Sequence, residues 1–266
     1  VKWQTDLEIE EILYLIENES DLFSIWDSIQ FLMSKCLINI AIQKRDKLLE
    51  KKVLSVLNRL FNRFSKDNRS FLASLITIPT YDQLESSQDL IDPISLTSAR
   101  EKFNGLIGTY LQLPLLELLK DCKENSLSAW PQGQGERKLI EMIWTLLIAS
   151  GNREVRKEIL HSVSGHSMTI SIAALKSLQC CDCEERKEAM DIFYKKWQNN
   201  PVVLDSWFSL EASIPRSNSL LTIKGLLDHP RFDPLAPNSI RAVLGGFAKN
   251  TTAFHSFDGR GYRFMA

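Results

Sequence analysis

The chain has 266 residues, of which 44% are hydrophobic, a composition typical of a folded protein of one or two domains. Its 32 basic and 33 acidic side chains give a net charge of −1 without a broad positive field, so we expect no nucleic acid and no anionic membrane as partner. Five cysteines, an odd number in a chain of this length, argue against a secreted disulfide framework and favour a cytoplasmic protein.

Apolar residues recur three and four positions apart along the first third of the chain, which predicts helices. The first acidic stretch, too acidic for a signal peptide, carries a short amphipathic helix behind a cap at Thr5. Ser20 or Asp21 caps a longer helix that reaches Ile40. Further helices are predicted over 53–64 and 70–76, followed by a one-turn piece within 81–90.

The middle of the chain combines a strong helix start with a loop-like end. Asp92 can cap a helix and Pro93 occupies its first position, where the missing N–H does no harm. We expect this helix to run toward Lys123, with a kink or break near Gln112 and Leu113 because Pro114 lies inside the pattern. Residues 123–135 are the most loop-like in the chain, and we predict a subdomain joint there.

Helical spacing continues to the end of the chain. A strongly apolar helix over 139–148 ends at Gly151, and shorter helices are expected at these positions: 154–163, 169–178, 184–197, a segment around Trp207 that ends before Pro215, 219–227, and 238–248, followed by a turn at 259–262. Residues 167–172 are the one candidate strand, but their flanks favour helix. The sequence therefore predicts an all-α fold, a superhelical stack of antiparallel helix hairpins similar to HEAT and armadillo solenoids, although no strict repeat period is visible.

Short motifs in the last quarter occur in a distinctive order. They are Leu204–Phe208, Gly225–Asp233, Pro237–Arg241, Phe254–His255 and Asp258–Tyr262, with fainter ones at Ser24–Asp27 and Ile91–Ile94. Together they resemble the C-terminal helical domain of bacterial-type aminopeptidase N, the zinc-dependent alanyl aminopeptidases. The resemblance implies a non-catalytic domain that caps the active-site chamber of a metallopeptidase and helps admit and orient peptide substrates. It also implies that the catalytic domain of the same polypeptide is a partner.

The catalytic machinery of that family is absent from these 266 residues. A zinc site of this type uses His-Glu-x-x-His on a helix, and none of the four histidines begins that motif. We therefore expect no cofactor in this chain, zinc in an absent catalytic domain, and no peptidase activity from the chain alone. The family's domain continues beyond its Gly-Tyr turn, so the chain is interpreted as a fragment at both ends.

Arg241 is the candidate substrate-binding residue. The resemblance implies that this arginine faces the internal channel, near the part of a peptide that follows the scissile bond, where a guanidinium can pair with a carboxylate. The equally weighted alternative is an arginine that binds helix carbonyls or a nearby acid. Asn238 is interpreted as a helix cap rather than a substrate ligand. Ala236 stands where the family commonly has asparagine.

Two further groups of residues could carry chemistry, but ordinary structural roles are favoured for both. Cys180, Cys181 and Cys183 lie close together without a second ligand pair, so we interpret them as thiols at a helix start that Asp182 caps. His161 and His166 are five residues apart, whereas ligand pairs on a helix favour three or four. The alternative reading of the whole chain is a free-standing helical-repeat scaffold that binds another protein.

Overall fold

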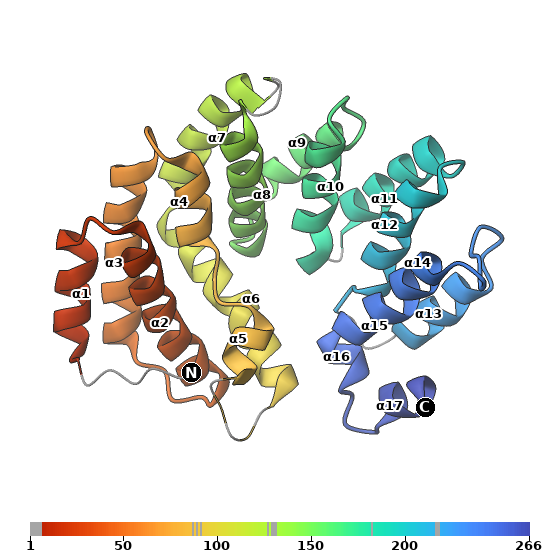
Figure 1. Ribbon diagram of the computed structural model, residues 1–266, viewed down its shortest axis with the longest axis horizontal. Coiled ribbons are helices and arrows are strands. Elements are labelled where there is room, and N and C mark those ends of the chain that lie inside the picture. The colour runs from red at the N-terminus through yellow and green to blue at the C-terminus, as the bar shows by residue number, and fades with distance from the viewer. Residues whose placement is uncertain are drawn as a thin grey trace. The chain divides into compact units, whose positions relative to one another are not determined.

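The computed structural model describes residues 7–86, 88, 90, 92–126, 128, 132–181, 183–215 and 219–266. Within these residues every regular element is helical, which confirms the predicted all-α class (Figure 1). None of the helices there is both long enough and apolar enough to cross a membrane. The chain divides into two compact units, residues 1–143 and 144–266, and the division falls inside one helix. The predicted joint at 123–135 precedes this division and stays a prediction.

The first unit is built around a long buried helix. Its helices are α1 (Ile9–Asn18), α2 (Leu22–Ala41), α3 (Lys47–Phe64), α4 (Arg69–Ile76), α5 (Tyr81–Ser86), α6 (Pro93–Tyr110), α7 (Gln112–Ser126) and the start of α8 (Gln134–Ala149). Helix α2 packs against α1, α3, α4 and α6. Its residues Ile25, Ile29 and Met33 are fully buried, because their spacing of four places them on one helix face.

Polar side chains mark the helix starts in this unit much as predicted. Asp21, rather than Ser20, caps α2 by accepting from the backbone N–H of Ser24 at 2.7 Å. Asp92 caps α6 in the same way, with Pro93 in the first position. Thr5 lies outside the described residues, and Glu8 occupies the cap position of α1.

Pro114 accounts for the break between α6 and α7. Helix α6 ends at Tyr110 and α7 begins at Gln112, with Leu111 between them. Proline has no N–H to donate to the carbonyl of Tyr110 four residues earlier, so the ladder cannot continue through this point. The predicted interruption is confirmed.

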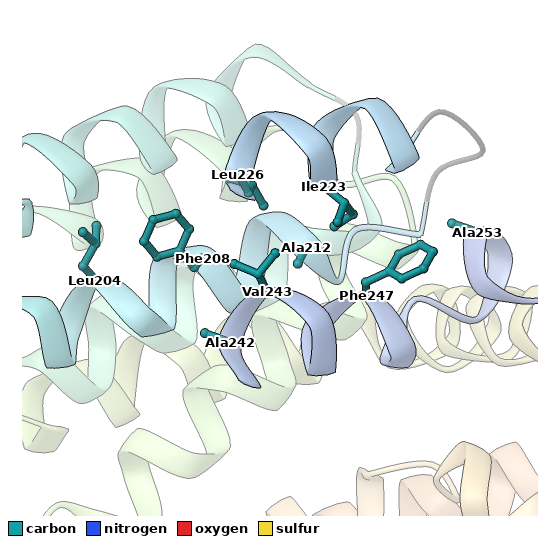
Figure 2. Close-up of a cluster of buried hydrophobic side chains, with 9 residues drawn as sticks. All are labelled: Leu204, Phe208, Ala212, Ile223, Leu226, Ala242, Val243, Phe247 and Ala253. Carbon is teal, nitrogen blue, oxygen red and sulfur yellow. The ribbon is translucent and has the colours of Figure 1, made fainter. Parts of the chain in front are cut away.

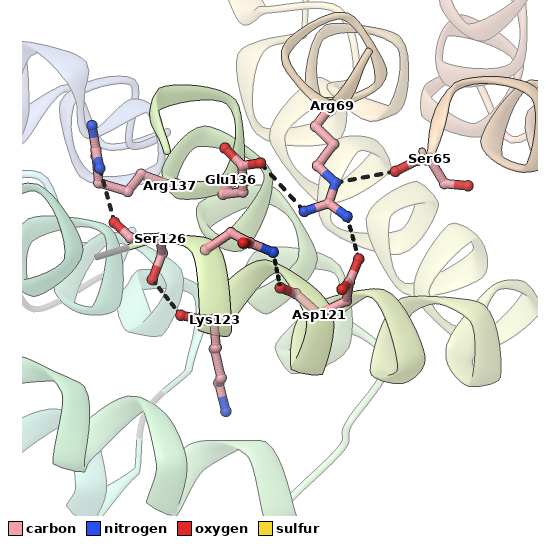
Figure 3. A network of polar contacts seen from close by, with 8 residues as sticks. Ser65, Arg69, Asp121, Lys123, Ser126, Glu136 and Arg137 are labelled. Atoms are coloured by element: carbon pink, nitrogen blue, oxygen red, sulfur yellow. Dashed lines mark hydrogen bonds and ion pairs between the residues drawn. The ribbon is translucent and has the colours of Figure 1, made fainter. Parts of the chain in front are cut away.

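An arginine links three helices of the first unit. The guanidinium of Arg69 on α4 forms ion pairs with Asp121 of α7 and with Glu136 of α8, the latter at 3.3 Å (Figure 3). Its Nε also donates to the backbone carbonyl of Ser65 at 3.2 Å. The Arg69 side chain is only 15% exposed, so these partners compensate a largely desolvated charge.

The second unit consists of shorter helices. They are α9 (Glu154–Val163), α10 (Met168–Ser177), η1 (Leu178–Cys180), α11 (Glu184–Trp197), α12 (Pro201–Ala212), α13 (Ser219–Leu227), α14 (Pro237–Ile240), η2 (Arg241–Gly245), α15 (Gly246–Lys249), α16 (Thr251–Phe254) and α17 (Arg260–Met265). The predicted bounds of α9, α11 and α13 are confirmed, and the helix favoured over a strand at 167–172 is the start of α10, which Ser167 caps.

Helix α12 forms the centre of the core of this unit. Phe208 and Ala212 on α12 pack with Val243 of η2 and Phe247 of α15, and Ile223 of α13 completes the same cluster (Figure 2). Burying one such large side chain contributes about 1.5–3 kcal/mol. The cluster thus fixes the short helices from α13 to α15 against α12.

The last segment differs from the prediction in three places. The helix expected over 238–248 is interrupted by η2, a π-helical turn, and its cap position belongs to Ala236, so the interpretation of Asn238 as the cap was wrong. The turn expected at 259–262 is instead the start of α17. Gly259 precedes that helix with φ of 67°, a left-handed conformation that glycine adopts without steric cost.

Candidate functional site

An open groove of about 500 Å³ lies on the second unit. Its walls come from α10, α12, α14, η2 and α15. The residues that line it are Ile172, Lys176, Asp205, Ser206, Ser209, Leu210, Asn238, Arg241, Ala242, Gly245, Gly246 and Lys249. The groove includes Arg241, the residue that the sequence singled out, and it therefore provides the candidate site.

Arg241 lies at the start of the π-helical turn, with its side chain exposed on the groove. Its Nη1 donates to Oδ1 of Asn238 at 3.2 Å. In the described part of the chain this amide is the hydrogen-bond partner of the guanidinium, and no ion pair with an acid accompanies it. A guanidinium has five N–H donors, so the amide leaves donors available for a ligand. Asn238 thus orients Arg241 without neutralising its charge.

The π-helical turn brings Arg241 to the groove while its neighbours stay in the core. Ala242 and Val243 are buried, whereas Arg241 is exposed. Single π-helical turns within α-helices are frequent at functional sites because the extra residue changes the direction of nearby side chains. No residue pattern in the sequence predicts this turn.

Two lysines and one aspartate complete the charged lining of the groove. Lys176 belongs to the last turn of α10 and Lys249 ends α15. Asp205 on α12 is the one acidic side chain of the lining, and partial burial raises its pKa. These three residues could not be recognised as a group from the sequence, because only the packing of three helices places them around one groove.

The floor of the groove depends on a close helix contact. A Cβ on Gly246 would lie 2.9 Å from Cβ of Ala212 and 3.1 Å from the carbonyl oxygen of Ser209. Glycine therefore lets α15 approach α12 more closely than any larger residue would. Ser206 and Ser209 line the same groove.

Within the cysteine cluster, Cys181 is not an activated thiol. Burial, followed by a hydrogen bond with Cys183, raises the pKa of Cys181 to about 12, so this thiol is neutral at physiological pH. Asp182 lies outside the described residues, and Cys183 occupies the cap position of α11 without a side-chain cap bond. Among the described residues, no three His, Cys, Asp or Glu side chains gather as a metal ion requires.

Comparison with protein families gives a match over residues 9–266 to a domain of unknown function (DUF3458_C) with ARM repeats. This match confirms the predicted helical-repeat fold.

Individual relatives show a consistent similarity. The chain is 31% identical to aminopeptidase N of Haemophilus influenzae over 272 residues and 29% identical to aminopeptidase N of Escherichia coli over 262 residues. These alignments cover 100% and 96% of this chain but 31% and 30% of the relatives. The chain thus spans about a third of the length of the curated relatives it matches.

A solved structure extends the similarity to three dimensions. The crystal structure of Legionella pneumophila aminopeptidase A in complex with aspartic acid matches with a TM-score of 0.85 at 25% sequence identity. The match covers 99% of this chain and 32% of that protein.

Proposed function

Because this chain belongs to the DUF3458_C family of ARM-repeat domains and resembles the C-terminal domain of aminopeptidase N, we propose that it is the non-catalytic helical domain of a zinc aminopeptidase. The relatives that carry the name aminopeptidase N are about three times as long as the segment they share with it. The His-Glu-x-x-His motif does not occur in the 266 residues. Peptide-bond hydrolysis would therefore be carried out by another domain of the same polypeptide, in which zinc activates water.

In this proposal the domain caps the active-site chamber and helps admit and orient peptides. The observation that carries it is Arg241, whose guanidinium is exposed on a groove and held by a neutral amide rather than by an acid. Such a group can bind a peptide carboxylate through two parallel hydrogen bonds. The partners would be the catalytic domain and the peptide substrate. The odd number of cysteines, five in a chain of this length, supports the proposed cytoplasmic location.

The mass of the native polypeptide in its source cell tests the first part of the proposal. An antibody raised against this chain should detect a product far larger than 30.4 kDa that hydrolyses an alanine anilide. A native product of 30.4 kDa without hydrolase activity would contradict the proposal and favour the free-standing scaffold.

Replacing Arg241 by alanine in the native enzyme tests the second part. We expect kcat/KM for tripeptides to fall by about tenfold, the loss of one charge-assisted hydrogen bond. Hydrolysis of alanine anilide should be unchanged, because this substrate has no peptide beyond the scissile bond. Arg153→Ala, at an exposed arginine that does not line the groove, is the matched control. Equal losses for both substrates would contradict a role in peptide orientation.

A further inference from the structure

Three cysteines lie between α10 and α11 (Figure 1). Cys180 ends η1, and Cys183 directly precedes α11. Of the five cysteines, Cys36 and Cys122 are buried in the first unit, whereas Cys180 is exposed and Cys181 and Cys183 are half-buried. A small reagent in solution can therefore reach the thiols of this cluster but not the other two.

The side chains of Cys181 and Cys183 are in direct contact. Burial and then a hydrogen bond with Cys183 raise the pKa of Cys181, so this contact holds the proton on Cys181 and the sulfur of Cys183 accepts it. Both backbones are extended, with φ of −117° at Cys181 and −133° at Cys183. Neither residue belongs to a helix, so a bond between the two sulfurs requires side-chain rotation but no unfolding of a helix.

We propose that Cys181 and Cys183 form a reversible disulfide by exchange with a low-molecular-weight disulfide such as oxidised glutathione. The thiolate of Cys183 attacks one sulfur of the small disulfide, which forms a mixed disulfide and releases the first small thiol. Cys181 then attacks the sulfur of Cys183, which closes the protein disulfide and releases the second small thiol. The protein loses two thiol protons and two electrons, and the small disulfide gains them as two thiols.

The surroundings of Cys183 fit the first attack. Its thiol donates a hydrogen bond to the carboxylate of Glu185, in the first turn of α11, which provides an acceptor for the thiol proton. The backbone N–H of Glu185, and to a smaller extent the nearby charges of Arg156 and Lys157 on α9, lower the pKa of that carboxylate. The two cations also favour a thiolate and attract the carboxylates of oxidised glutathione. Cys181 needs no activation, because it attacks a mixed disulfide that is already held next to it.

Cys180 differs from the other two cysteines in its contacts. Its Sγ donates to the backbone carbonyl of Ser177, the last residue of α10, at 3.7 Å. A disulfide between the adjacent residues Cys180 and Cys181 would force the peptide bond between them out of its ordinary planar geometry. We therefore expect Cys180 to take no part in the disulfide, and Cys180→Ser is the matched control.

Thiol labelling of the unmodified chain measures the exchange. After incubation with oxidised glutathione, the 266-residue chain is denatured and alkylated with N-ethylmaleimide. The reduced chain takes up five labels, and we expect three after the incubation and five again after dithiothreitol. All three cysteines of the cluster lie in the tryptic peptide 177–186, and its fragmentation should place the remaining label on Cys180.

Serine variants test the order of attack. Cys181→Ser should stop at one glutathione bound to Cys183, because the second thiol is missing. Cys183→Ser should form no internal disulfide, whereas Cys180→Ser should form it at the rate of the unmodified chain. Circular dichroism establishes that each variant is folded.

Two results would overturn the inference. The first is five labels after incubation of the unmodified chain, which does not depend on the folding of any variant. The second is an internal disulfide that includes Cys180, whether in the unmodified chain or in the variants without Cys181 or Cys183. Neither Cys181 nor Cys183 lines the groove, so both results are independent of the proposed function.

Discussion

Asn250 connects three segments of the second unit through one buried amide. Its side chain donates to the backbone carbonyls of Ala212, at 3.5 Å, and Ile214 and to Oγ of Ser219 at 2.9 Å. Its Oδ1 accepts from the backbone N–H of Ala253 at 3.2 Å and so caps α16. The residue is 1% exposed, so water cannot replace these partners.

Replacing Asn250 should destabilise the second unit strongly. Asn250→Ala leaves several buried polar atoms without this partner and should lower the free energy of unfolding by about 2–3 kcal/mol. Asn250→Asp should cost more at neutral pH, because an ionised carboxylate cannot donate to the three acceptors. Urea unfolding measures both. Asn199→Ala, at an exposed asparagine, should change stability by less than about 0.5 kcal/mol; an equal loss at both sites would disprove the role assigned to Asn250.

His229 lies among aromatic rings near the end of α13. Its ring centroid is 5.5 Å from that of Tyr194, 5.8 Å from Trp207 and 5.3 Å from Phe208. Its Nδ1 accepts from the backbone N–H of Arg231 at 3.1 Å. Burial, followed by the nearby charge of Arg231, lowers the pKa of His229, so the folded state favours the neutral ring.

This lowered pKa predicts a loss of stability in acid. The contribution of neutral His229 is complete above the unfolded pKa of about 6.5 and is lost as pH falls through that value toward the lower folded pKa. The urea midpoint should therefore drop between about pH 7.5 and pH 5.5, and less so in His229→Asn. His161→Asn, at an exposed histidine, is the control. If the urea midpoint of His229→Asn has the same pH dependence as that of the unmodified chain, His229 does not cause the loss of stability in acid.

At the scale of elements, two adjacent glycines contribute differently to the contact between α12 and α15. A Cβ on Gly246 would collide with Ala212 and Ser209, whereas a Cβ on Gly245 would meet only Cγ of Arg241, at an ordinary 3.5 Å. Position 246 thus requires glycine, whereas position 245 has room for a Cβ.

This pair provides a matched test of packing. Gly246→Ala should lower the free energy of unfolding by about 1–3 kcal/mol, because α15 must move away from α12. Gly245→Ala should be neutral or stabilise by up to about 1 kcal/mol, because alanine favours helix more than glycine does. Thermal unfolding of the two variants measures both changes in stability. Similar effects of the two substitutions would show that α15 and α12 are less closely packed than described.

Helix boundaries were predictable where a local signal sets them. Asp21, Asp92 and Pro114 act through contacts within four residues, so the sequence contains all the information that these helix ends need. Helices α14 and α16 have four residues each and are too short for apolar periodicity to show them. The π-helical turn was equally hidden, because five residues are too few for apolar periodicity to reveal it.

At the scale of the molecule, the fold class was predictable and the groove was not. Helical spacing throughout the chain excluded a sheet, and Arg241 was identified through resemblance alone. Lys176 and Asp205 lie on helices that are separate in sequence from Arg241, so only tertiary packing brings them to one surface. No local sequence pattern predicts that residues on these separate helices line one groove.

In a helical-repeat architecture, a destabilising substitution should affect mainly the helices around it. In stacked helices each element contacts mainly its sequence neighbours, so stability is close to a sum of local terms. Phe208→Ala removes a side chain that is 1% exposed from the core around α12. Hydrogen exchange should accelerate over 201–266 and stay unchanged over 7–86. A uniform increase over both ranges would instead show that the chain unfolds as one cooperative body.

The π-helical turn at 241–245 should allow the chain to change in length by one residue without turning the flanking helices away from the core. Five residues there complete a turn that an α-helix completes with about four, so the segment holds one residue more than regular geometry needs. Deleting Gly245 should convert the turn to α-helix while α14 and α15 keep facing α12. This position can therefore absorb a change of length by one residue, which the uninterrupted helices elsewhere in the unit could accommodate only by rotating their buried faces by about 100°.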